Sequence, residues 1–222
     1  DALPILLSAG GCTSFELFRR WVVSDKKILE LEKATKQTEL QQLKKQINPH
    51  FLFNMLNNAN ILVKDAPDEA SQILEKLDNL LRYQLNDSTR REVFLTADIQ
   101  FLTSFLELEK VRRDHFEYTI FQEGNMENIC IPPLLFIPFV ENAVKHNLDS
   151  DNLSYVHLYF SVHNKQLTFR CENSKPRVPV KREGGIGLAN VKRRLDLLYE
   201  SRYTLQIEDK ETTYNVNLHL NL

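Results

Sequence analysis

The sequence predicts an α+β chain in which an N-terminal helical hairpin is followed by an α/β sandwich. Up to about residue 111, apolar side chains recur at steps of three and four, the spacing of amphipathic helices. Further along, three segments alternate apolar with polar side chains, as half-buried strands do: 156–162, 167–171 and 214–220. Helical spacing returns between the strands, so a sheet covered on one side by helices is the simplest arrangement.

Size and composition narrow the classes of function. A chain of 222 residues suits two modest domains. The 28 Lys and Arg residues nearly balance the 30 Asp and Glu residues, which argues against binding to a nucleic-acid backbone. Three cysteines, Cys12, Cys130 and Cys171, are odd in number and scattered in apolar sequence. We expect them to be reduced, buried thiols in a cytosolic compartment.

The first element is an apolar segment over residues 2–18, followed at once by basic residues that begin with Arg19 and Arg20. This pattern predicts that residues 1–23 are the end of a transmembrane or juxtamembrane helix, with the basic cluster on the cytoplasmic side. The segment is shorter than the roughly 20 residues of a full span and contains one proline and two glycines. The alternatives are a short buried or amphipathic helix, or a disordered end.

The second element is a polar helix over residues 26–45, which contains neither glycine nor proline. Leu40, Leu43 and Ile47 fall at alternating steps of three and four, as in a coiled-coil seam. A solvent-exposed connecting helix is the alternative. A seam of this kind, leading from a membrane into a bundle, would also serve to carry a signal.

The seam reaches His50 at the next step, directly after Pro49. Proline removes a backbone donor and clashes with the carbonyl four residues earlier, so a kink before His50 is expected. Asn54 lies one helical turn further on. The apolar side chains move to a neighbouring stripe, which places His50 at the edge of the packed face: Phe51, Leu52, Met55, Leu56 and Leu62.

A turn at residues 65–68 separates this helix from another that ends near Asn86. The second helix is expected to bury Ile73, Leu74, Leu77, Leu80 and Leu81. So short a turn makes the two helices antiparallel neighbours. One hairpin has too little core to stand alone, whereas two hairpins form a four-helix bundle. We therefore expect residues 24–90 to be a linker and dimerisation domain in a homodimer.

Residues 91–222 form the predicted α/β domain. Thr96 is the expected N-cap of a helix with one apolar face: Ile99, Leu102, Phe105, Leu106 and Val111. A strand is expected over residues 116–121. The double proline at Pro132 and Pro133 is expected to open a helix that ends near Leu148.

Three patterns in this domain have the residue types of a phosphate or base site. Asn142, Lys145 and His146 share one helical turn, so an amide carbonyl for Mg²⁺ and a cation for phosphate can face one pocket. Strand alternation places Asn173 on the inward face at a strand end, where it can read a base edge. Gly185 and Gly187 at a helix start let backbone amides approach phosphates. The respective alternatives are an exposed helix face, a turn residue and an ordinary glycine turn.

Together with the run Asn-Pro-His-Phe-Leu-Phe-Asn around His50, and in this order, these patterns resemble the LytS-like sensor histidine kinases. The resemblance covers roughly residues 37–222. It implies a GHKL-type ATP-binding domain, the fold shared with gyrase. It also implies roles for the matched residues: His50 as phosphoacceptor, Asn142 as ligand of Mg²⁺ on the triphosphate, Lys145 and His146 as phosphate neighbours, and Gly185, Gly187 and Leu188 as the end of a nucleotide lid.

The resemblance implies a function as well. A chain of this family phosphorylates His50 from Mg·ATP at the cytoplasmic face of the bacterial inner membrane and passes the phosphate to an Asp of a response regulator. Asn54 would position water for dephosphorylation of that partner. The alternatives are a catalytically weak or inactive dimeric scaffold of the same fold, and a GHKL ATPase or protein-serine kinase.

Two departures from the GHKL pattern bear on these alternatives. Asn173 stands where the superfamily has an adenine-reading Asp, and Glu172, on the opposite strand face, is the competing candidate. Pro138 occupies the position at which gyrase-like ATPases keep a water-activating Glu. A hydrolase needs that base, whereas a kinase that phosphorylates its own histidine does not.

Overall fold

The computed structural model describes residues 19–21, 26–27, 30, 49–147, 152–176 and 186–222. The apolar segment over residues 2–18, residues 31–48 of the predicted seam and kink, and Gly185 lie outside the described residues, and the domain boundaries stay predictions. Contacts group His50–Leu222 into one compact unit. Within the described part of the chain, no helix is long and apolar enough to cross a membrane.

The helices of this unit are α2 (Pro49–Asp65), α3 (Pro67–Asn86), the 3-10 turn η1 (Asp87–Thr89), α4 (Leu95–Arg112), α5 (Ile137–His146) and α6 (Ile186–Tyr199). The strands are β1 (Val93–Phe94), β2 (Phe116–Glu123), β3 (Cys130–Ile131), β4 (Ser154–His163), β5 (Gln166–Ser174), β6 (Tyr203–Asp209) and β7 (Thr213–Asn221). Side chains are described from Phe51 onward in α2 and from Leu188 onward in α6.

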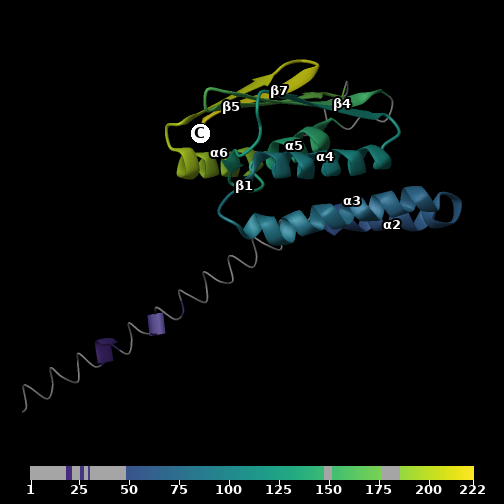
Figure 1. Cartoon of the computed structure of the whole chain (residues 1–222), viewed down its shortest axis with the longest axis horizontal. Helices are drawn as coiled ribbons and strands as arrows, with labels where there is room; N and C mark the ends of the chain where they lie inside the picture. Colours follow the sequence, from purple (N-terminus) through teal and green to yellow (C-terminus); the bar gives the residue numbers. More distant parts are fainter. Residues whose placement is uncertain (1–18, 22–25, 28–29, 31–48, 148–151, 177–185) are drawn as a thin grey trace, which may run out of the picture. The chain divides into compact units, whose positions relative to one another are not determined.

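The predicted helical hairpin is confirmed: α2 and α3 lie side by side, joined at Ala66 (Figure 1). Its buried seam consists of Met55, Ala59, Ala70, Ile73, Leu77 and Leu80. Leu56 and Leu74 were expected to be buried but are 42% and 45% exposed in this single chain. Since two helices bury only their facing stripes, further apolar side chains of a hairpin stay outside its core.

Helix α4 differs from its predicted form at both ends. It begins at Leu95, with Phe94 as the N-cap residue and no side-chain cap, so the prediction of Thr96 as the cap is wrong. The Leu95 amide instead donates to the carbonyl of Ile129 (2.8 Å), next to the short β1–β3 ladder. Val111, at the other end, is exposed. Between its ends α4 is buried nearly all round, which is expected of a helix packed on both sides.

The sheet has the order β2-β4-β5-β7-β6. β2 pairs parallel with β4, and the other pairs are antiparallel. The strands predicted over 116–121, 156–162, 167–171 and 214–220 are confirmed. Edge strand β6 was not predicted, because most of its residues are exposed and its alternation is weak.

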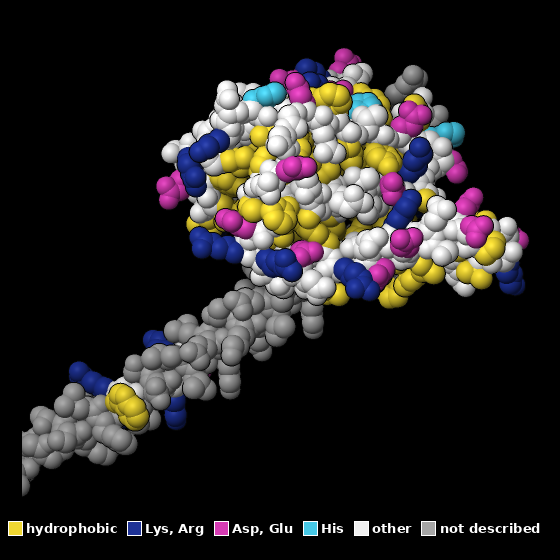
Figure 2. Space-filling view, viewed as in Figure 1, with side chains coloured by type: hydrophobic (Ala, Val, Ile, Leu, Met, Phe, Trp, Pro, Cys, Tyr) yellow, Lys and Arg dark blue, Asp and Glu magenta, His cyan; other side chains and the backbone are white. Residues whose placement is uncertain are grey.

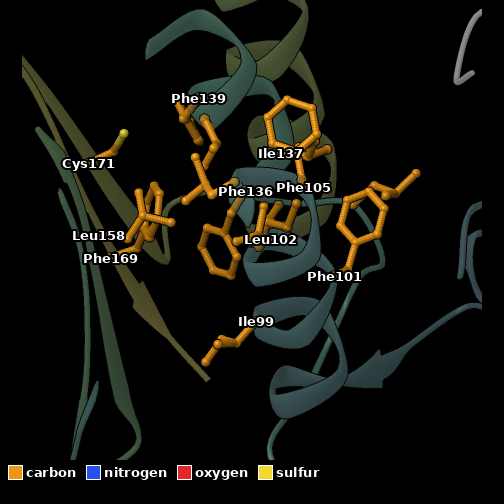
Figure 3. Packing of buried hydrophobic residues seen from close by; sticks show 14 of the residues in the cluster. Ile99, Phe101, Leu102, Phe105, Phe136, Ile137, Phe139, Leu158, Phe169 and Cys171 are labelled. Carbon is orange, nitrogen blue, oxygen red and sulfur yellow. The ribbon is translucent and has the colours of Figure 1, made fainter. Parts of the chain in front are cut away.

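Helices α4, α5 and α6 cover one face of the sheet, and the core lies between these two layers (Figures 1 and 3). Four fully buried aromatic side chains fill its centre: Phe136, Phe139, Phe160 and Phe169. Phe136 contacts Phe169 at 4.5 Å between ring centroids and Phe160 at 5.3 Å, which joins the helix layer to the sheet. The α+β class is therefore confirmed, whereas the dimeric four-helix bundle stays a prediction for a pair of chains.

Two further predictions need correction. The segment after Pro132 is a turn, and α5 begins only at Ile137, because Leu134 adopts a left-handed backbone conformation (φ 54°) that no helix contains. Cys171 is buried as expected, but Cys130 is exposed, since in β3 it is Ile131 that points inward. Cys12 lies outside the described residues.

Candidate nucleotide site

Helix α5 presents the predicted polar residues beside its buried face. The apolar face is anchored by Phe139, Val140, Ala143 and Val144, all at most 4% exposed. Asn142 and His146 are half-buried at the edge of this face, and Lys145 is exposed. His146 already interacts with neighbouring groups. The helical spacing thus brings an amide, a cation and an imidazole to one end of α5.

At the end of β5, Asn173 lies on the inward face, as its strand parity predicts, and is only 1% exposed. Its Nδ2 donates to the carbonyl of Ser174 (2.8 Å). Glu172 lies on the outer face of the sheet, where it accepts a hydrogen bond from Arg170 (2.5 Å). Of the two candidates for reading adenine, only Asn173 therefore faces the helix layer.

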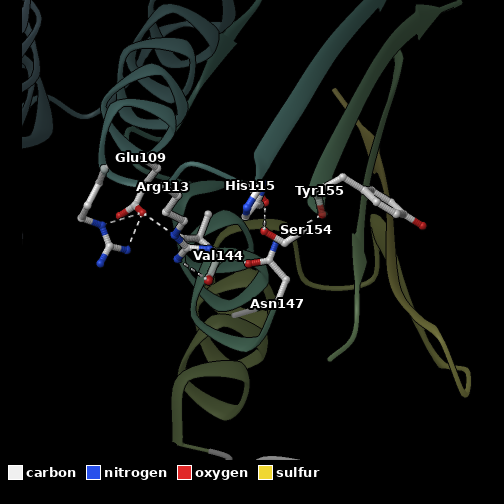
Figure 4. A network of polar contacts seen from close by, with 8 residues as sticks. Glu109, Arg113, His115, Val144, Asn147, Ser154 and Tyr155 are labelled. Carbon is white, nitrogen blue, oxygen red and sulfur yellow. Dashed lines mark hydrogen bonds and ion pairs between the residues drawn. The ribbon is translucent and has the colours of Figure 1, made fainter. Parts of the chain in front are cut away.

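Polar contacts join the end of α5 to β4, as Figure 4 shows, and continue from β4 to the end of β5. Asn147, which follows α5 and is fully buried, donates from Nδ2 to the carbonyl of Tyr155 in β4 (3.2 Å). The amide of Tyr155 donates to Ser174 Oγ (3.0 Å). These two bonds bring the helix end that carries Asn142 to the strand end that carries Asn173.

Helix α6 supplies the third predicted element. Gly187 lies in its first turn, and Leu188 is half-buried against the core. Arg194 donates from Nη1 to the carbonyl of Leu134 (3.1 Å) and from Nη2 to that of Pro133 (2.6 Å), so α6 is fastened to the turn that precedes α5. Burial lowers the pKa of Arg194 from its usual high value. The glycine run before α6, with Gly185, lies outside the described residues.

The two residues predicted on the hairpin lie apart from these elements in the sequence. Asn54 is half-buried in α2 and already interacts with neighbouring groups. His50 is in the first turn of α2, and its side chain lies outside the described part of the chain. Its neighbour Phe51 packs against Phe105 of α4, with 5.3 Å between ring centroids. The candidate nucleotide residues are on α5, β5 and α6.

Sequence reasoning missed several residues that hold this region together. Asp98 and Arg194 fix the turn at Leu134, and Arg113 and Asn147 fix the end of α5. The bonds by which Asp98, Arg194 and Arg113 hold the two ends of α5 span 31 to 61 residues of the chain. No local pattern marks such contacts.

Cys171, near Asn173, is no nucleophile, since burial raises the pKa of its thiol to about 12.

Known proteins are similar in sequence to this chain, both over the hairpin and over most of its length. Residues 38–116, which include the hairpin and α4, match the family model described as "Histidine kinase". Over 203 residues the chain is 30% identical to "Sensor protein LytS" of Staphylococcus haemolyticus, a match that covers 85% of this chain and 35% of that protein. It is 31% identical over 119 residues to "Sensor histidine kinase YpdA" of Escherichia coli, covering 54% of this chain and 21% of that protein.

A solved structure, the histidine kinase domain of a blue-light activated kinase from Erythrobacter litoralis, is 17% identical, with a TM-score of 0.46 over 82% of this chain and 90% of that domain. The family match over residues 38–116 and the identity to LytS over most of the chain place this chain in the histidine kinase class. Within that class, the chain belongs to the LytS-like sensor histidine kinases. It spans about a third of the length of the LytS relative.

Proposed function

We propose that this chain is the kinase part of a two-component sensor, which binds Mg·ATP between α5, β5 and α6 and phosphorylates itself on His50. The observation that carries the proposal is the junction of α5 with β5. Through Asn147, Tyr155 and Ser174, the turn that carries Asn142 is held beside the strand end that carries Asn173. A nucleotide has phosphates at one end and a base at the other. A phosphate-binding turn and an amide that reads the base, at one edge of a domain, can therefore bind both ends of one nucleotide.

The residues fit the two ends of this substrate. Asn173 has an amide oxygen that can accept a hydrogen bond from the exocyclic amine of adenine. Lys145 and His146 can neutralise charge on the phosphates. Among the described residues no three His, Cys, Asp or Glu side chains gather to hold a metal by themselves. Mg²⁺ would therefore be bound by the triphosphate together with the side-chain oxygen of Asn142.

The transfer step needs little covalent chemistry from the protein. A neutral ring nitrogen of His50 attacks the γ-phosphorus, the bond from that phosphorus to the bridging oxygen breaks, and ADP leaves. The other ring nitrogen of the resulting imidazolium gives up its proton. Pro138 replaces the water-activating Glu of gyrase-like ATPases, which favours transfer to the histidine over hydrolysis. We infer that the phosphate then passes to an Asp of a response regulator.

The hairpin supports the homodimer of this proposal. Several large apolar side chains on α2 and α3 are exposed in the single chain: Phe53, Leu56, Ile61, Val63, Leu74 and Leu85. Apolar surface of this extent on a two-helix unit favours association with another such unit. In the whole protein we place this dimer at the cytoplasmic face of the inner membrane, with Asn54 acting in dephosphorylation of the partner.

Calorimetric titration with a non-hydrolysable ATP analogue tests the nucleotide site. We expect binding by the wild-type chain that is strengthened by Mg²⁺. In Asn142→Ala the Mg²⁺ effect is expected to shrink, since the variant lacks the proposed metal ligand. A folded wild-type chain that releases no heat of binding, with or without Mg²⁺, would instead support the inactive scaffold.

A further inference from the structure

Arg113 lies between α4 and β2 in the sequence, and its side chain contacts both of these elements and α5. It directly follows α4, and its side chain is only 10% exposed. Nη1 donates to Asn147 Oδ1 (2.9 Å), and Nη2 donates to the carbonyl of Val144 (2.8 Å), as Figure 4 shows. One guanidinium group therefore holds both the last turn of α5 and the residue that follows it.

This contact is a cap on α5. The last carbonyls of a helix have no partner within the helix, and a cation near them is favoured by the helix dipole. Val144 belongs to this last turn, which also carries Lys145 and His146. Without Arg113, the carbonyl of Val144 would lose its donor. The turn would then be free to shift relative to the sheet.

The contact continues to the other end of the candidate site. Asn147 receives its hydrogen bond from Arg113 on Oδ1 and donates from Nδ2 to Tyr155. Tyr155 in turn donates its amide to Ser174, which is next to Asn173. The phosphate side of the site on α5 and the adenine side on β5 are thus set by one chain of bonds that starts at Arg113.

The guanidinium group of Arg113 is held in place by Glu109 and Phe116. Its Nε is 3.2 Å from Oε2 of buried Glu109, close enough for an ion pair but not aligned as a hydrogen bond. The guanidinium also lies over the ring of Phe116, 5.2 Å from its centroid. Burial lowers the pKa of Arg113, but an arginine stays charged near neutral pH. Glu109 and Phe116 therefore fix the direction in which the two donating nitrogens point.

We propose that Arg113 is a positioning residue of the nucleotide site, which keeps Asn142 and Lys145 at the distance from Asn173 that one bound nucleotide requires. This inference rests on the proposed function, because it concerns the same site. A planar fork is needed for the role, since two acceptors, a backbone carbonyl and an amide oxygen, are held at once. Lysine has the same charge but no such fork.

The test compares Arg113→Lys with Arg112→Met in the full 222-residue chain. Arg112 pairs with the same Glu109 (2.6 Å) and, within the described part of the chain, forms no hydrogen bond or ion pair with α5, so its substitution is the matched control. Titration with ADP and initial rates of autophosphorylation are measured for each folded variant. For Arg113→Lys we expect the Kd for ADP and the KM for ATP to rise about tenfold, with kcat changed less than about threefold. Arg112→Met is expected to match the wild type within about twofold.

The possible results separate the positioning role from a purely structural one. A structural arginine would lower the melting temperature of Arg113→Lys and leave the Kd of the folded protein unchanged, which would overturn the proposal. If Arg113→Lys does not fold, Asn147→Ala removes one of the two acceptors, and an unchanged Kd in that variant overturns it equally. A wild-type chain that binds no nucleotide contradicts the proposed function, and the positioning role with it.

Discussion

The hydroxyl of Tyr83 in α3 donates a 2.5 Å hydrogen bond to Oδ1 of Asp98 in α4, a carboxylate with no exposed surface. The amide of Leu134 donates to the same oxygen (3.1 Å), whereas Oδ2 is buried and has no hydrogen-bond partner among the described residues. This bond joins the hairpin that carries His50 to the domain that carries the candidate nucleotide site. The ring of Tyr83 also stacks on Phe101, 4.7 Å between centroids.

Tyr83→Phe is expected to lower the free energy of unfolding by about 1–3 kcal/mol, because it leaves a buried carboxylate with one donor fewer. The ring contact with Phe101 is kept. Lys76→Met is the control, since Lys76 forms a half-exposed ion pair with Glu107 across the same helices (3.1 Å) and contributes at most about 1 kcal/mol. Urea unfolding measures both variants, and equal small losses would contradict a structural role of the Tyr83–Asp98 bond.

The same carboxylate predicts a pH dependence of stability. Burial raises the pKa of Asp98 from 3.8 to about 6. The hydrogen bond from Tyr83 lowers the same pKa, but its effect is smaller than that of burial. The folded state therefore binds this proton more tightly than the unfolded state. The stability from this group is complete below the unfolded pKa and is lost as pH rises through the folded pKa.

Asp98→Asn removes this titration. We expect the unfolding free energy of the variant to improve relative to wild type by about 2 kcal/mol between about pH 4 and pH 6.5. Urea unfolding at several pH values measures the difference. A difference that is flat across this range would show that Asp98 does not titrate there.

The base-reading role of Asn173 can be separated from that of its neighbour. Asn173→Leu is expected to weaken ADP binding at least about tenfold, because it removes the amide on the inward face. Glu172→Gln is expected to change it less than about twofold, because Glu172 points to the outer face and pairs with Arg170. Titration calorimetry measures the Kd for ADP of both variants. A larger rise in Kd for Glu172→Gln than for Asn173→Leu would show that Glu172 reads the base.

The exposed apolar side chains of the hairpin predict how the homodimer is broken. Leu74→Glu is expected to weaken the dimer at least about tenfold, because a charge would be buried between two hairpins. Leu197→Glu is the control, since Leu197 is 77% exposed on α6, away from the hairpin in sequence. Sedimentation of both variants measures the dimer. Equal behaviour of the two would contradict association through the hairpins.

Local pattern was enough to predict the hairpin, the interior strands and the inward face of Asn173, because each depends on spacing within one element. The start of α5 was not predictable in this way. A double proline is compatible with a first helical turn, and only the turn at Leu134, fixed by Asp98 and Arg194 from two other helices, delays the helix. The end of α5 is likewise set by Arg113, whose acceptors are 31 and 34 residues away.

The candidate site shows the same division. Asn142, Lys145 and His146 share a turn by helical geometry alone, so the sequence was sufficient to group them. Their proximity to Asn173 depends on Asn147 and Tyr155, whose residue types carry no signal of that role. Edge strand β6 escaped prediction for another reason: a strand with little buried surface has little alternation to detect.

The most direct test of the account is the fate of the γ-phosphate. The wild-type chain and His50→Gln are incubated with γ-labelled ATP and Mg²⁺, and the protein is then exposed to acid or base. We expect wild-type label that is lost in acid and retained in base, as a phosphorylated histidine would be, and no label on His50→Gln. Label of equal amount on a folded His50→Gln variant would contradict His50 as the phosphoacceptor.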